Sequence, residues 1–148
     1  MANLSALTTL IELAQKATDA AAKRLGAALK AEEDCEAKLQ MLLGYRDDYA
    51  KRLIEQQQAG MTPQAYANFV AFMGKLDQAV NGQRDVTKHA HQKSVMEKTA
   101  WQAAERKRLS YRTLTERASV EALKIENKRD QKMMDDHAAR RSNDKHGY

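Results

Sequence analysis

Residues 58–63 read Gln-Ala-Gly-Met-Thr-Pro, and Pro63 is the single proline of the 148-residue chain. Glycine is favoured just past the C-terminus of a helix, which suits Gly60. Thr62 supplies a capping hydroxyl, and Pro63 suits a first helical position, where no N–H is needed. The run therefore predicts a turn at 59–62 between helices over about 4–58 and about 63–140, with a frayed polar tail over 141–148.

Helix one carries a heptad pattern typical of a coiled-coil seam. Sixteen positions from Leu4 to Gln56, taken in alternate steps of three and four, contain twelve apolar or aromatic side chains. The pattern of the second helix is less regular, and after Lys93 its phase weakens, which predicts a stutter or a change of partner. Asn81-Gly82 could form a tight turn, but no strand pattern flanks it, so a continuous helix with a local weak point is favoured.

These observations predict an all-α chain: a single domain over 1–148 that folds as a long antiparallel two-helix coiled-coil hairpin. The second helix is the longer one. With a turn centred near residue 61, facing residue numbers sum to about 122, so positions beyond about 118 have no partner on the first helix. The C-terminal helix end should therefore overhang. The apolar positions of the two helices can pack against each other within one chain, which predicts a monomer.

Composition disfavours a compact enzyme, because 30% of residues are charged and only 5% are aromatic. Such a chain offers little material for a deep pocket, so we expect no catalytic residues, cofactor, metal or small-molecule ligand. Cys35 is the single cysteine, and His89 and His91 point to different faces of a helix, so neither predicts a metal site. A single cysteine fits a reducing compartment, and the sequence has no long apolar run. Together these features predict a cytoplasmic protein, soluble or peripherally bound to the membrane.

Two surfaces are candidate binding sites. Near the turn, the apolar surface is wider than one seam requires, and it comprises Leu42, Tyr45, Tyr49, Phe72, Leu76 and Ala79. It is either a patch for another protein or the ordinary shoulder of a helix pair. The second surface is the overhang, because residues 101–148 hold twelve Lys or Arg against eight Asp or Glu, whereas residues 1–60 hold eight against nine.

The run from Glu126 to Arg140 resembles the C-terminal signature of the flagellar FliJ family, small coiled-coil components of the flagellar type III export apparatus. Further matches include Leu7 and Leu10 in the first helix and Trp101 in the second. The departures are mild, and they are Lys128, Asp136 and His137, where the family favours arginine, glutamate and often an aromatic residue.

The resemblance implies a non-enzymatic stalk that links the flagellar export ATPase ring to the transmembrane export gate and contacts export chaperones. It implies that the patch near the turn faces the gate. It also implies that the ATPase side includes Asp130, Gln131, Lys132, Met134, Asp135 and Arg140. An alternative is a structural coiled-coil protein that self-associates and has no stalk role. A basic helical nucleic-acid binder is disfavoured, because one tryptophan on a mixed-charge helix is a weak signal.

Overall fold

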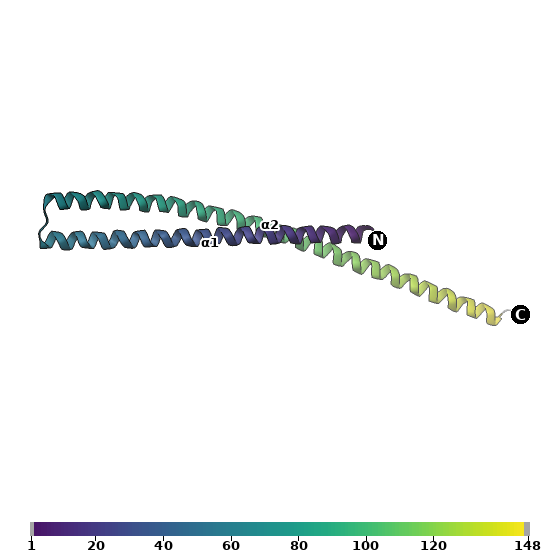
Figure 1. The fold of residues 1–148 in the computed structure, drawn as a ribbon. Helices are drawn as coiled ribbons and strands as arrows, with labels where there is room; N and C mark the ends of the chain where they lie inside the picture. The colour runs from purple at the N-terminus through teal and green to yellow at the C-terminus, as the bar shows by residue number, and fades with distance from the viewer. Residues whose placement is uncertain (1, 147–148) are drawn as a thin grey trace. The chain divides into compact units, whose positions relative to one another are not determined.

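The computed structural model describes the backbone of residues 2–146 and the side chains of residues 4–145. The described chain consists of helix α1 (Ala2–Ala59) and helix α2 (Pro63–His146), labelled in Figure 1. It is an all-α antiparallel coiled-coil hairpin, as predicted. Its residues form two compact units, one over Asp19–Gln102, which contains the turn, and one that combines Met1–Thr18 with Ala103–Tyr148. We refer to the first as the hairpin unit and the second as the terminal unit.

The turn has the chemistry that its sequence predicts. Gly60 adopts a positive φ of 98°, which an L side chain rarely tolerates. Thr62 caps α2, because its Oγ1 accepts a hydrogen bond of 3.1 Å from the backbone N–H of Ala65. Helix α2 then begins at Pro63. It continues through Asn81-Gly82, so the continuous-helix interpretation of that dipeptide is confirmed.

The seam of α1 follows the predicted ladder. Fifteen of its sixteen positions are buried or half-buried, and Gln56 is the exposed exception. Ala14, Ala21 and Ala28 are among the buried side chains, at 7%, 1% and 4% exposure. Because these three residues are small, they leave room for the two helices to approach each other at their level.

The predicted phase shift in α2 is wrong between Met73 and Ala118. Apart from Glu105, the buried and half-buried positions there keep alternate steps of three and four, at Met73, Leu76, Val80, Gln83, Thr87, Ala90, Ser94, Glu97, Trp101, Ala104, Arg108, Tyr111, Thr115 and Ala118. Six of these residues are polar or charged, so an apolar pattern alone concealed a regular seam. A polar side chain can occupy such a position where a hydrogen bond satisfies it.

Polar layers in the hairpin unit meet that condition. Gln83 Nε2 and Thr87 Oγ1 donate hydrogen bonds of 3.0 and 3.3 Å to the backbone carbonyl of Cys35. Buried Ser94 donates through Oγ to Glu32 at 2.5 Å, and His91 Nδ1 lies 2.6 Å from the other carboxylate oxygen of Glu32. The hydrogen bond from Ser94, followed by that from His91, lowers the pKa of Glu32 below its ordinary value of 4.5.

The register of the hairpin unit matches the predicted one. Cross-helix contacts pair residues whose numbers sum to about 122, namely Arg24 with Glu97, Glu32 with His91, Arg46 with Asp77 and Tyr49 with Phe72. The oppositely charged groups of Arg24 and Glu97 lie 3.4 Å apart, and those of Arg46 and Asp77 lie 3.5 Å apart. The register therefore rests on aromatic, ionic and hydrogen-bonded contacts along the whole unit.

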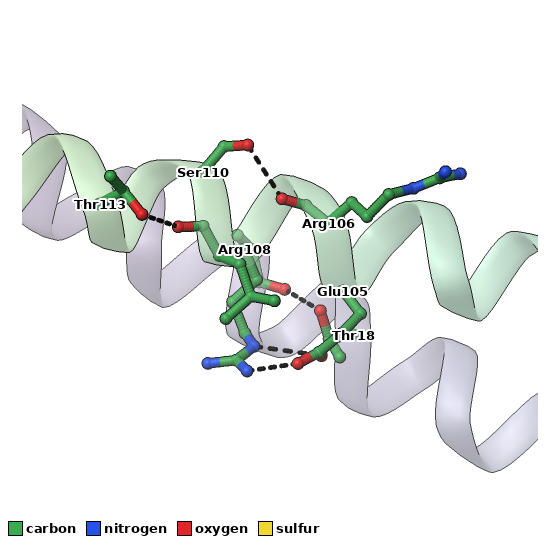
Figure 2. Close-up of polar contacts among 8 residues, drawn as sticks. Thr18, Glu105, Arg106, Arg108, Ser110 and Thr113 are labelled. Carbon is green, nitrogen blue, oxygen red and sulfur yellow. Dashed lines mark hydrogen bonds and ion pairs between the residues drawn. The ribbon is translucent and has the colours of Figure 1, made fainter.

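In the terminal unit, Ala14 and Thr18 are buried, and α2 is half-buried at intervals as far as Ala118. Thr18 Oγ1 donates to the carbonyl of Ala14 at 2.9 Å. Figure 2 shows this bond together with a local ion pair of α2, in which Arg108 engages both carboxylate oxygens of Glu105 and lowers its pKa. Ser110 and Thr113 in the same view bond back to carbonyls of their own helix, at 3.0 Å each.

All described side chains from Ser119 to Lys145 are exposed. The seam of α2 thus ends at Ala118, at the position where the sequence predicted that pairing stops. We call residues 119–146 the unpaired segment. It remains helical to His146, six residues beyond the predicted end, because the polar run from Arg141 contains no glycine or proline before residue 147. The last two residues of the predicted frayed tail lie outside the described residues.

Candidate functional sites

The aromatic side chains near the turn lie together on the hairpin unit and are partly exposed. Tyr49 packs its ring against those of Phe69 and Phe72, each at 4.6 Å between centroids. Tyr45 and Phe72 stay 55% and 45% exposed. Aromatic side chains with this exposure, beside a seam that is already filled, are typical of protein-binding surfaces.

Four of the six predicted patch residues line one hollow. We call it the aromatic hollow. It has a volume of about 380 Å³ and is lined by Tyr45, Asp48, Tyr49, Arg52, Phe72 and Leu76. Leu42 and Ala79 do not line it. Leu42 is a half-buried seam residue, and Ala79 is exposed seven residues after Phe72 on the same flank of α2.

Sequence reasoning missed the two charged residues of the aromatic hollow. Asp48 and Arg52 lie three and seven residues after Tyr45, which places them on the same face of α1. The i, i+3, i+7 spacing was available in the sequence as a signal. A search for apolar residues could not select Asp48 and Arg52, although they give the hollow one negative and one positive side chain.

The second candidate surface is the unpaired segment. The predicted residues Asp130, Gln131, Lys132, Met134, Asp135 and Arg140 are all exposed on it. Met134 and Arg140 also line a shallow hollow together with Met133, Asp136 and His137. Met133 and Met134 are 71% and 73% exposed, which is unusual for large apolar side chains.

Apolar side chains continue along the first part of the unpaired segment. Val120, Leu123 and Ile125 are 54%, 58% and 49% exposed. Single exposed apolar residues are ordinary, but five of them on one helix without a packing partner indicate a surface that another protein can cover.

Among the described side chains, neither surface gathers the ligands of a metal centre. Among the described residues, no group of three or more His, Cys, Asp or Glu side chains could hold a metal ion. His91, for which the sequence predicts no metal site, is exposed and contacts Glu32 across the seam. Within the described part of the chain, no helix has an apolar stretch long enough to cross a membrane.

The fold defines a class, the helical-hairpin coiled coil, and the two exposed surfaces are its candidate binding sites. The family profile described as "Flagellar FliJ protein" matches residues 3–147. The chain therefore belongs to the flagellar FliJ family, whose members are components of flagellar protein export.

Relatives agree with this assignment. The Flagellar FliJ protein of Escherichia coli (strain K12) is 34% identical over 140 residues, and that of Salmonella typhi is 31% identical over 140 residues. Each alignment covers 95% of this chain and 95% of the relative. A solved structure of a YscO homologue from Chlamydia trachomatis has the same fold, with a TM-score of 0.50 and 18% identity over 93% of this chain and 90% of that chain.

Proposed function

We propose that this protein is a non-enzymatic stalk that links the flagellar export ATPase ring to the transmembrane export gate. The observation that supports the proposal is the presence of two exposed surfaces of different character in different units, both of them candidate binding surfaces. The aromatic patch belongs to the hairpin unit, and the unpaired segment belongs to the terminal unit. A protein that only transmits contact between two partners needs two such surfaces and no catalytic centre.

The aromatic patch, with Leu42, Tyr45, Tyr49, Phe72, Leu76 and Ala79, is the proposed gate-facing surface. Large aromatic side chains give most of the binding energy of an interface when a partner desolvates them, and Tyr45 and Phe72 are the most exposed aromatic rings of the patch. Binding to the gate would hold this cytoplasmic protein at the membrane peripherally. Export chaperones are further proposed partners, with no residue assigned to them.

The unpaired segment, including Asp130, Gln131, Lys132, Met134, Asp135 and Arg140, is the proposed ATPase-facing surface. Its exposed methionines can adapt to an apolar pocket, and its alternating charges can steer the encounter. Because no described side chain of α1 covers this segment, a partner can surround it on every side.

The gate contact is tested by equilibrium binding of the full chain to the soluble cytoplasmic part of the export gate. Phe72→Ala should weaken binding by more than about 1 kcal/mol, because the ring is an anchor outside the seam. Val95→Ala is the matched control, since Val95 is 49% exposed on α2 away from the patch. Equal effects of the two variants, or a loss of helicity that accounts for the weaker binding of Phe72→Ala, would contradict the assignment.

The ATPase contact is tested by truncation. A chain ending at Leu123 should lose binding to the ATPase ring and retain the thermal unfolding of the hairpin unit. A chain ending at Arg141, which removes only the last seven residues, should bind normally. Retained binding after the longer truncation would remove the unpaired segment from the interface.

A further inference from the structure

A second hollow lies on the same flank of the hairpin unit as the aromatic hollow. This alanine hollow has a volume of about 200 Å³, and it is lined by Arg24, Ala27, Ala28, Ala31, Ala90, Lys93 and Glu97. On α1, each residue that lines the alanine hollow lies 21 positions before a residue that lines the aromatic hollow, namely Tyr45, Asp48, Tyr49 or Arg52. On α2, Lys93 and Glu97 lie 21 positions after Phe72 and Leu76. Twenty-one residues are three heptads, so both hollows occupy equivalent positions on one flank of the coiled coil.

Small and apolar residues connect the two hollows along this flank. Ala79 and Val86 lie one and two heptads after Phe72 on α2, and both are exposed, Val86 at 50%. Equivalent residues in the two hollows are about 32 Å apart along the helix axis, at 1.5 Å per residue. We call this flank, from the aromatic hollow to the alanine hollow, the groove; between the two hollows α1 contributes Asp34, Lys38 and Met41 to it.

The groove carries more positive than negative charge, because Asp48 and Arg52 of the aromatic hollow offset each other and the remaining carboxylates are engaged. Glu97 is engaged by Arg24 at 3.4 Å, and Asp34 is engaged by Lys30 at 3.0 Å. Within the described side chains, this leaves Lys38 and Lys93 without an ion pair. Lys75, beside Leu76, likewise has no ion-paired partner in the described part of the molecule. Carboxylates are the groups that these ammonium ions would attract.

We propose that one acidic amphipathic α-helix of the export gate occupies this whole groove and packs as a third helix on the hairpin unit. This rests on the proposed function, in which the aromatic patch faces the gate. A groove that repeats every seven residues fits a helix whose apolar residues have the same repeat. Large apolar side chains of that helix fill the space above Ala27 and Ala31, and its acidic edge pairs with Lys38, Lys75 and Lys93.

The test uses the full chain, the soluble cytoplasmic part of the export gate, and a carboxylate placed in the alanine hollow. Ala31→Glu should lower affinity about tenfold, because the new side chain fills the hollow and repels an acidic helix. Lys93→Glu should also lower affinity, and raising the salt concentration should reduce its effect. Ala37→Glu, on the outer face of the same helix, is the matched control and should change affinity less than about twofold.

The outcomes separate the two proposals. If Phe72→Ala weakens binding while Ala31→Glu and Lys93→Glu behave like Ala37→Glu, the gate contacts only the aromatic hollow and the extended groove is wrong. If none of these variants weakens binding, the gate-facing assignment itself fails. Circular dichroism of Ala31→Glu must show native helicity and unfolding temperature. If it does not, Lys93→Glu, which replaces an exposed side chain, decides the question alone.

Discussion

The paired and unpaired parts of α2 share a secondary structure and differ in what stabilises it. From Met73 to Ala118 the helix buries one stripe against α1, and Val80 is completely buried there. From Ser119 onward every described side chain faces outward. An isolated helix is only marginally stable, because most helical stability in proteins comes from packing of one face. The paired part should therefore keep its helical structure without a partner, and the unpaired segment should become rigid only when a partner covers it.

Replacing one valine by aspartate in each part of α2 should give the largest difference in the free energy of unfolding. Val80→Asp places a carboxylate at a site with 0% exposure, and it should destabilise the hairpin unit by more than about 3 kcal/mol. Val120→Asp is the same change at a side chain that is 54% exposed, and its effect should stay within about 0.5 kcal/mol. Urea unfolding followed by circular dichroism measures both, and similar destabilisation by both variants would show that the unpaired segment is packed in solution.

Glycine substitutions sharpen the comparison between the turn and the helices. Gly60→Ala should destabilise the chain by about 1 kcal/mol, because its φ of 98° strains any L side chain. Gly82→Ala should instead stabilise it by roughly 0.5–1 kcal/mol, since Gly82 is helical and a Cβ there meets no atom within 4 Å. Thermal unfolding of the two variants should shift in opposite directions, and a stabilising Gly60→Ala would contradict the turn geometry.

The Glu32 layer predicts a smaller, pH-dependent effect. The pKa of Glu32 is lowered below 4.5 in the folded state, so its contribution to stability is present above the unfolded pKa and is lost as pH falls through the folded pKa. Glu32→Gln should therefore lose less stability than the unchanged protein between neutral pH and pH values below 4.5. Glu36→Gln is the control at an exposed site of the same helix. If the wild type and Glu32→Gln lose the same amount of stability as the pH falls, ionised Glu32 does not stabilise the folded chain.

The features predicted from the sequence are those that depend on local chemistry. Gly60, Thr62 and Pro63 determine the turn, and the heptad ladder of α1 determines one seam and the register. The α2 seam was harder, because Gln83, Thr87 and Ser94 occupy it through hydrogen bonds that only a partner helix makes possible. The contact between His91 and Glu32 escaped prediction for the same reason, since residues 59 positions apart become neighbours only after pairing.

The binding surfaces were predictable in outline. Aromatic residues beside a filled seam indicated Tyr45 and Phe72, and the difference in helix length indicated the unpaired segment. The alanine hollow was not predicted, because exposed alanines such as Ala27 and Ala31 have no distinctive pattern in a sequence rich in alanine. Their meaning depends on Lys93 and Glu97 of the other helix, which complete the hollow.

Hydrogen exchange of the full chain, measured free and then with each partner, tests the stalk proposal most directly. With the export ATPase, protection should rise over residues 124–140, because the unpaired segment gains a packing partner, while the region around Tyr45 and Leu76 should change little. With the soluble part of the export gate, protection should rise around Tyr45 and Leu76 instead. Protection by the ATPase at the aromatic patch, with residues 124–140 unchanged, would mean that the two surfaces serve the opposite partners from those proposed.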